Sequence, residues 1–161
     1  MSEILGTLFK YLVALLGVAA VVLILYQVFG ANKTQNAISD ITLLQTNTQA
    51  LYSAQSTFTS VSNTIAINGK LAPQGMISGS TLINPWGGAI TIAVNTGSAA
   101  QFDITEAAVP AESCAKMIVG LSSVVGLKVN ATAQVLPLDA GTAVTACAQP
   151  TNNTMVFTFA H

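Results

Sequence analysis

The chain has 161 residues, of which 52% are hydrophobic and 7% are charged, and its net charge is −1. Beyond residue 30 it has four scattered lysines and no arginine, so nucleic-acid binding, which depends on clustered Lys and Arg, is not expected. A net charge this close to zero leaves little long-range repulsion between copies of the chain.

The N-terminus is a long apolar run. From Ile4 to Phe29 only Lys10, Gln27 and a few small residues interrupt it. About 20 helical residues cross a bilayer core of roughly 30 Å, so the run is long enough to do so. A cleavable signal peptide, a transmembrane anchor and the spine of an assembled fibre all begin this way. The run is too long for a signal peptide and its start, Met1-Ser2-Glu3, is not basic, so cleavage as a signal peptide is not expected.

Helical spacing continues beyond the apolar run. Residues recur three or four apart along one stripe: Ala37, Ile41, Leu44, Thr48, Leu51 and Gln55. This predicts one helix of about 50 residues, whose glycines (Gly6, Gly17 and Gly30) are its weak points. Its first half is apolar all round and its second half is two-faced, so we divide the chain into residues 1–30 and a globular part, residues 31–161, that includes the second half.

The globular part is predicted to be an antiparallel sheet lying on the long helix, with one further helix. Residues 56–82 hold many turn signals and are expected to form a surface loop. The turn Asn84-Pro85-Trp86-Gly87-Gly88 leads into a strand over residues 89–94, which returns as a second strand over residues 101–106. We expect Trp86 to anchor the core beside that turn.

The distal half supplies the further helix and two more strands. Pro110 is expected in the first position of the helix, with Glu112 in its first turn. Its apolar face consists of Cys114, Met117, Ile118, Leu121 and Val125. Residues 127–135 and 155–159 are expected to form strands, and in the second of them Met155, Phe157 and Phe159 alternate with Val156 and Thr158.

Two cysteines, Cys114 and Cys147, are predicted to form a disulfide. An even cysteine count beyond an apolar span is typical of an oxidising compartment. A metal site would need more ligands, and His161, expected to be solvated, is the only histidine. We therefore predict no metal, no cofactor and no catalytic residues. Asp103, Glu106 and Glu112 are not expected to converge into a carboxylate pair, and no nucleophile stands beside a base.

The chain resembles the type IV pilins, and among them the type IVb group that includes bundle-forming and thin conjugative pilus subunits. The resemblance covers nearly the whole chain. The first parts of the sequence on which the resemblance rests are the apolar helix, the segment Asn32-Lys33-Thr34-Gln35-Asn36-Ala37-Ile38 and the turn Asn84-Pro85-Trp86-Gly87-Gly88. The others are Val109-Pro110-Ala111-Glu112-Ser113-Cys114, Cys147 and the final segment Asn153-Thr154-Met155-Val156-Phe157.

This resemblance implies a structural subunit, the major pilin, with an α+β fold in which the apolar half of the long helix protrudes. Such a subunit is held in the bacterial inner membrane and then stacked with copies of itself into an extracellular filament for adhesion, conjugation or motility. Its implied partners are a prepilin peptidase and the pilus assembly machinery. Two alternatives stay open: a minor pilin or tip adhesin, and a pseudopilin of a secretion system.

The resemblance also directs attention to the N-terminus as the assembly surface, formed by Met1, Glu3, Lys10, Leu12, Leu16 and Val22. Mature pilins usually carry a glutamate at position five, whereas here position five is Leu5 and the nearby acid is Glu3. One interpretation is that Glu3 pairs with the amine of Met1 or with Lys10, within one subunit or between two; the other is that Glu3 and Lys10 both lie at the membrane interface, with the Lys10 side chain extending outward. A lysine within an apolar span costs about 2.5–3.5 kcal/mol on insertion scales. If Met1 is a processed terminus, the resemblance implies that its amine is methylated.

Overall fold

The computed structural model describes the backbone of residues 2–161 and the side chains of residues 6–22, 24, 25 and 32–161. Met1 therefore lies outside the described residues. The chain divides into two compact units, and the division falls between Lys33 and Thr34. Helix α1 (Ser2–Leu51) is 50 residues long, which confirms the predicted helix, and none of its glycines interrupts it.

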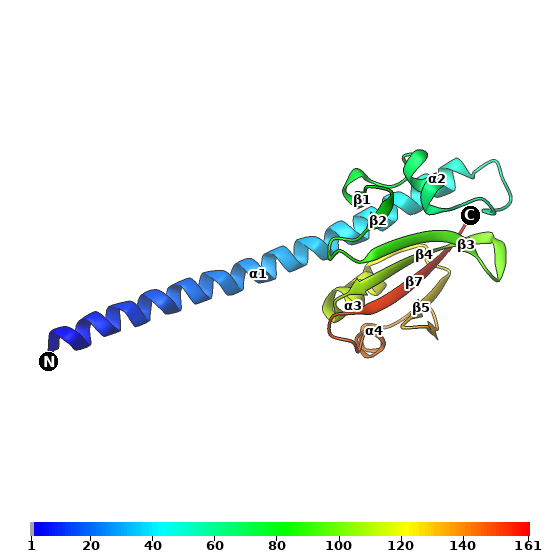
Figure 1. The fold of residues 1–161 in the computed structure, drawn as a ribbon. Coiled ribbons are helices and arrows are strands. Elements are labelled where there is room, and N and C mark those ends of the chain that lie inside the picture. The colour runs from blue at the N-terminus through cyan, green and yellow to red at the C-terminus, as the bar shows by residue number, and fades with distance from the viewer. Residues whose placement is uncertain (1) are drawn as a thin grey trace. The chain divides into compact units, whose positions relative to one another are not determined.

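The second unit, Thr34–His161, is called the head below. Its seven-stranded antiparallel sheet has the order β1-β2-β3-β4-β7-β5-β6 (Figure 1). The strands are β1 (Ile77–Ser78), β2 (Thr81–Ile83), β3 (Ala89–Asn95), β4 (Ser98–Val109), β5 (Gly126–Val129), β6 (Thr132–Gln134) and β7 (Asn153–Ala160). The helices besides α1 are α2 (Asn63–Asn68), the 3₁₀ turn η1 (Gln74–Met76), α3 (Ala111–Gly120) and α4 (Ala140–Ala146).

The head is built around one buried face of the sheet. Alternate residues of β4 and β7 point to that face, and the register pairs Phe102 with Phe159 and Ile104 with Phe157. Within the head, α1 covers this face with a buried stripe at the predicted spacing of three and four residues: Thr34, Ala37, Ile41, Leu44 and Thr48. The burial of these apolar side chains is the main stabilising contribution to the head.

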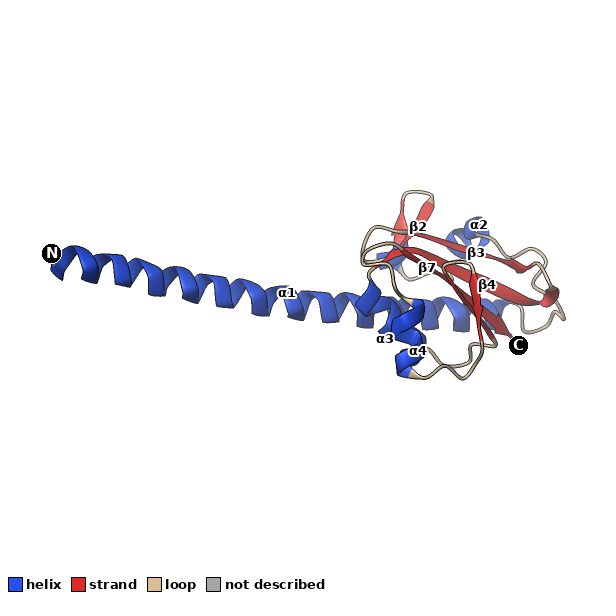
Figure 2. Ribbon diagram, turned by 90° about the horizontal axis from the view of Figure 1, so that it is seen from below, coloured by secondary structure: helices blue, strands red, loops and turns tan. Residues whose placement is uncertain are grey.

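Helix α3 packs beside the head portion of α1 (Figure 2). The hydroxyls of Thr34 and Ser113 are 2.8 Å apart and share a hydrogen bond. At the other end of α3, a Cβ on Gly120 would lie 2.9 Å from Cδ1 of Ile38, so a larger residue would press the two helices apart. The first turn differs slightly from the prediction, because Pro110 is the N-cap with an extended backbone and the helix begins at Ala111.

Residues 56–82 were predicted to form a loop, and this prediction is wrong. They hold α2, η1, β1 and the start of β2. The Ser62 hydroxyl accepts a hydrogen bond from the backbone of Ile65 and so caps α2. These elements have six residues or fewer, too short to show a periodic pattern, and the packing of Phe58 and Met76 in the core holds them in place.

The distal strands and helices also differ from the prediction. Residues 127–135 form two strands rather than one, because Asn130 and Ala131 have φ values of 50° and 68° and turn the chain back. Helix α4 was not predicted. It is capped by the Asp139 carboxylate, which accepts hydrogen bonds from the backbones of Gly141 and Thr142. Its small residues gave no apolar stripe to detect.

Candidate functional site

The first candidate site is the exposed apolar surface of α1 before the head. Large apolar side chains there are each about half to two thirds exposed: Leu8, Phe9, Tyr11, Leu12, Val13, Leu15, Leu16, Val18, Val21, Val22, Ile24 and Leu25. Soluble monomers rarely leave so large a contiguous apolar surface in water, so a surface of this kind marks a binding interface. Each such side chain contributes roughly 1.5–3 kcal/mol when it is buried.

The residues predicted for assembly lie within this surface as far as they are described. Leu12, Leu16 and Val22 are 52%, 67% and 58% exposed, and Lys10 is exposed as well. Met1 and the side chain of Glu3 lie outside the described residues, so the predicted Glu3 contacts stay a prediction. Within the part of the chain that was searched, no helix has the length and hydropathy needed to cross a membrane.

The second candidate site is the disulfide between Cys114 and Cys147, which joins the pair that the sequence predicted. Cys114 lies on α3 and Cys147 is the C-cap of α4, and their Cα atoms are 5.9 Å apart. Both residues are buried. The bond therefore fastens the two short distal helices to each other, and the Ala111 backbone N–H adds a hydrogen bond to the Pro150 carbonyl.

Buried Asn153 holds this disulfide region against the sheet. Its Nδ2 donates to the backbone carbonyls of Val109 and Gln149, and its Oδ1 accepts from Nδ2 of Asn130 at 2.9 Å. Oδ1 of Asn130 in turn accepts from the backbone of Thr154. Sequence reasoning missed this network, because an asparagine in a polar segment gives no sign that it will be buried.

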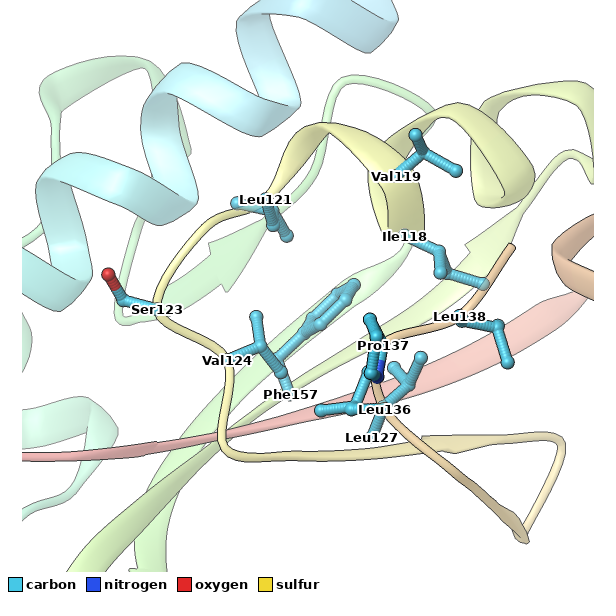
Figure 3. A pocket seen from close by; sticks show the side chains of 10 residues that line it. All are labelled: Ile118, Val119, Leu121, Ser123, Val124, Leu127, Leu136, Pro137, Leu138 and Phe157. Atoms are coloured by element: carbon cyan, nitrogen blue, oxygen red, sulfur yellow. The ribbon is translucent and has the colours of Figure 1, made fainter. Parts of the chain in front are cut away.

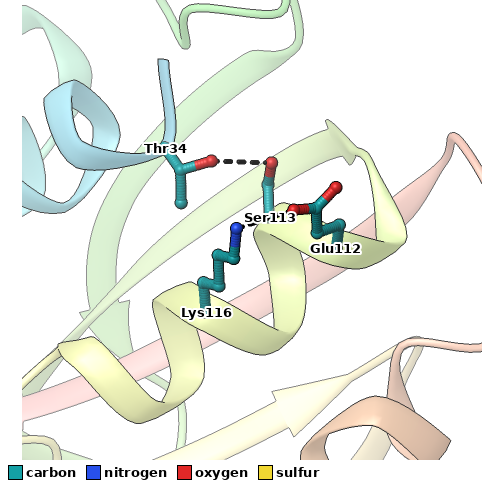
Figure 4. Close-up of polar contacts among 4 residues, drawn as sticks. All are labelled: Thr34, Glu112, Ser113 and Lys116. Atoms are coloured by element: carbon teal, nitrogen blue, oxygen red, sulfur yellow. Dashed lines mark hydrogen bonds and ion pairs between the residues drawn. The ribbon is translucent and has the colours of Figure 1, made fainter. Parts of the chain in front are cut away.

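Polar contacts on α3 complete the region (Figure 4). Lys116 Nζ lies 2.6 Å from Oε1 of Glu112, one helical turn away, and both side chains are largely exposed. An exposed pair of this kind contributes about 0.3–0.5 kcal/mol. Ser113 lies on the inner side of α3, takes no part in this ion pair and shares its hydrogen bond with Thr34.

The three acids do not converge, as predicted. Asp103 and Glu106 are three residues apart on β4 and so point to opposite faces of the sheet. Asp103 accepts hydrogen bonds from Asn95 and Thr158, whereas Glu112 pairs with Lys116. Among the described residues that were searched, no cluster of His, Cys, Asp and Glu could hold a metal ion.

Glu106 is the acid with an unusual environment. It is fully buried, and neither carboxylate oxygen has a hydrogen-bond partner among the described residues. Burial raises its pKa to about 8, the nearby Asn84 side chain lowers it in part, and the charge of Asp40 raises it further. Nδ2 of Asn84 donates a hydrogen bond to the Ala107 carbonyl at 2.8 Å. Glu106 is therefore a protonated core residue at neutral pH.

The Asn84-Pro85-Trp86-Gly87-Gly88 turn is organised by its first residue. Oδ1 of Asn84 accepts hydrogen bonds from the backbones of Trp86 and Gly88, at 3.1 and 2.7 Å. Trp86 is partly buried and packs on the core, as expected. The C-terminal His161 is exposed, but its ring stacks on Phe58 at a centroid distance of 4.3 Å, which the prediction of a solvated residue did not include.

An apolar pocket of about 450 Å³ opens beside the end of α3 (Figure 3). Its walls come from α3, the loop that follows α3, β5, β7 and the segment before α4: Ile118, Val119, Leu121, Ser123, Val124, Leu127, Leu136, Pro137, Leu138 and Phe157. Among these described residues, the only polar side chain is that of Ser123. The pocket therefore offers shape and a largely apolar surface.

Comparison with known proteins agrees with this fold. A family model described as PilS N terminal matches residues 31–160. The crystal structure of a type IV b pilin from Salmonella typhi has a TM-score of 0.65 at 24% identity, covering 79% of this chain and 99% of that one. TcpA, a type IV pilin from the Vibrio cholerae El Tor biotype, has a TM-score of 0.55 at 16% identity, covering 79% of this chain and 98% of that one.

No curated protein sequence matches the chain. The family model nevertheless extends over most of its length, from the head portion of α1 to the end of β7. The chain therefore belongs to the PilS N-terminal family, and its fold is that of the type IVb pilins.

Proposed function

We propose that the chain is a major pilin, the structural subunit of an extracellular type IV pilus, and that the apolar surface of α1 holds its subunits together. The observation that carries this proposal is the exposed apolar row from Leu8 to Leu25, joined to a head with its own complete core. A helix that is apolar all round has to be covered by lipid or by other helices. Copies of the same chain supply that cover in a filament.

The head supports an extracellular role. Its disulfide is of the kind that persists in oxidising compartments. Its described surface also carries few charges, so heads can be crowded together with little mutual repulsion. Before assembly, the subunit is proposed to lie in the inner membrane through residues 1–30, where a prepilin peptidase and the assembly machinery act on it. Residues 31–161 then form the outer layer of the pilus, which serves adhesion, conjugation or motility.

Electron microscopy of material sheared from cells, together with mass spectrometry of its N-terminal peptide, tests the proposal. The expected result is thin filaments made mainly of this chain, and the peptide mass would establish whether Met1 is a processed, methylated terminus. A chain that stays in the cell envelope, or that forms only a trace component of filaments, would instead be a pseudopilin or a minor pilin. Either of those results would overturn the major-pilin proposal.

A further inference from the structure

Glu106 combines full burial with the lack of a partner. Its side chain lies on the same face of β4 as Phe102 and Ile104, the face that α1 covers. Its cross-strand neighbours, Ile90 and Met155, are apolar. Neither carboxylate oxygen has a hydrogen-bond partner among the described residues. A neutral carboxyl group is tolerated in such a place, whereas a carboxylate without partners is strongly unfavourable.

The elements packed around Glu106 bring one further charge close to it. That charge is Asp40 on α1, which is itself partly buried. Strands β3 and β7 contain no titratable residue, and Asn84 of the neighbouring turn is uncharged. Asp103, the other acid near it on β4, points to the opposite face of the sheet. An ionised Glu106 would therefore meet a second negative charge, and no cation in the described part of the chain is close enough to affect its pKa.

Strand β4 is irregular immediately after Glu106. Between Glu106 and Val109 the register of β4 against β7 shifts, so that β4 has one extra residue in this bulge. Ala108, within the bulge, has a φ of 56°, a left-handed conformation that residues other than glycine rarely adopt. The pairing of β4 with β3 also ends at Glu106. The ladder hydrogen bonds that keep a strand closed to water are therefore interrupted beside the buried acid.

Helix α1 is held over this part of the sheet by packing alone. The side chains of its head portion that hydrogen-bond to other elements lie at its two ends, with Thr34 at one end and Asn47 and Gln49 at the other. In the described stretch between them, residues 35–46, the side-chain hydrogen bonds stay within the helix. Asp40 lies in the middle of that stretch. The contact between α1 and the bulge of β4 can therefore open locally without breaking a hydrogen bond across it.

We propose that Glu106 is a pH-sensitive latch between α1 and β4: while it carries its proton the contact stays closed, and when the proton is lost the contact opens to water at the bulge. Opening hydrates the Glu106 carboxylate and screens it from Asp40. The pKa of Glu106 is about 8 when it is buried and 4.5 in its ordinary state. Opening therefore becomes more favourable as the pH rises from about 5 to 8 and levels off above pH 8. The latch is a property of the head and does not depend on the proposed filament.

Labelling of an engineered cysteine measures the opening. Cys114 and Cys147 are joined in a disulfide, so Ala37→Cys supplies a single free thiol. Ala37 is buried on α1, one helical turn from Asp40. Ser39→Cys, exposed on the same helix, is the matched control for the pH dependence of the thiol itself. In the full chain in detergent micelles, the ratio of the maleimide labelling rates, Ala37→Cys over Ser39→Cys, should rise by up to about tenfold per pH unit between pH 5 and 8.

Two variants assign the opening to the latch. Glu106→Gln cannot ionise, so the ratio should keep its pH 5 value throughout, and a rise that persists in this variant overturns the proposal. Asp40→Asn removes the neighbouring charge and should lower the ratio at pH 8 severalfold. An unchanged ratio there would overturn the part given to Asp40. Ile41→Cys, also buried on α1, repeats the measurement if Ala37→Cys does not fold.

Unfolding of the whole head would also expose Ala37, and a further reporter separates the two events. Val129 is buried on β5, which is paired with both β6 and β7. Because a local opening at α1 leaves these ladders intact, Val129→Cys should be labelled at least about tenfold more slowly than Ala37→Cys at pH 8. Equal rates overturn the latch, since they would mean that the head opens as a whole.

Discussion

The carboxylate of Asp40 on α1 lies close enough to Glu106 on β4 to raise the pKa of Glu106, adding to the larger rise that burial causes. Across the sheet, Glu106 is paired with Ile90 on one side and Met155 on the other. Glu106 therefore lies in a row of apolar side chains on the sheet, under helix α1, which carries the second acid, Asp40. The head accommodates this arrangement by keeping Glu106 protonated.

The first prediction is that the head loses stability as the pH rises from about 5 to 8. The unfolded chain releases the Glu106 proton near the ordinary pKa of 4.5, whereas the folded chain keeps it until about pH 8. The free energy of unfolding should therefore fall with pH, by at most about 1.4 kcal/mol per pH unit, and level off above pH 8. Urea unfolding of the full chain in detergent micelles, followed by Trp86 fluorescence, measures this fall.

The variant Glu106→Gln should abolish most of that pH dependence and be more stable than the unaltered chain at pH 8, because an amide cannot ionise. Glu112→Gln, which changes an exposed acid, is the control and should keep the full dependence. A Glu106→Gln profile that parallels the unaltered one would show that Glu106 is ionised in the folded head.

The second prediction concerns the disulfide. Replacing Cys114 and Cys147 by serine should lower the free energy of unfolding by about 3–4 kcal/mol, because the open chain gains the entropy of a loop with a sequence separation of 33. Hydrogen exchange should show the loss first in α3 and α4, which the bond joins. Equal protection in the reduced and oxidised chains would mean that packing alone holds these helices.

The third prediction is that Asn153→Ala destabilises the head by about 2–4 kcal/mol. The change leaves the buried carbonyl of Val109 without its side-chain donor, and the Asn130 amide keeps only its longer hydrogen bond to the Ala146 carbonyl. The adjacent Asn152 is exposed, so Asn152→Ala is a control that should change stability by less than about 0.5 kcal/mol. Denaturant midpoints of the two variants compare them directly, and equal midpoints would contradict the role given to Asn153.

The fourth prediction tests the turn before β3. A Cβ on Gly88 would overlap the carbonyl of Ala107, so Gly88→Ala should force β3 and β4 apart and destabilise the head by about 2 kcal/mol or more. Gly75→Ala is the matched control, because a Cβ there meets no atom within 4 Å and its φ is not positive. Thermal melting of both variants should show a lower midpoint for Gly88→Ala alone.

The sequence was most informative where a pattern is long or a residue type is rare. The 50-residue helix, the β3–β4 hairpin, the alternating strand at Met155 to Phe159 and the cysteine pair were all predicted and are all present. Elements of two to seven residues, such as α2, β1, β6 and α4, were missed, because tertiary contacts rather than local pattern decide them. The buried state of Glu106 and Asn153 was missed for a related reason, since it depends on which strands become neighbours.

The two ends of the sheet are short strands. Strand β1 has two residues and β6 has three, so each edge offers few free backbone groups to a neighbouring chain. A long, flat edge would let crowded heads join sheet to sheet, which is the route to cross-β aggregation. Few charges keep neighbouring heads apart. The short edge strands therefore protect the subunit from amyloid-like association at the concentrations that polymerisation requires.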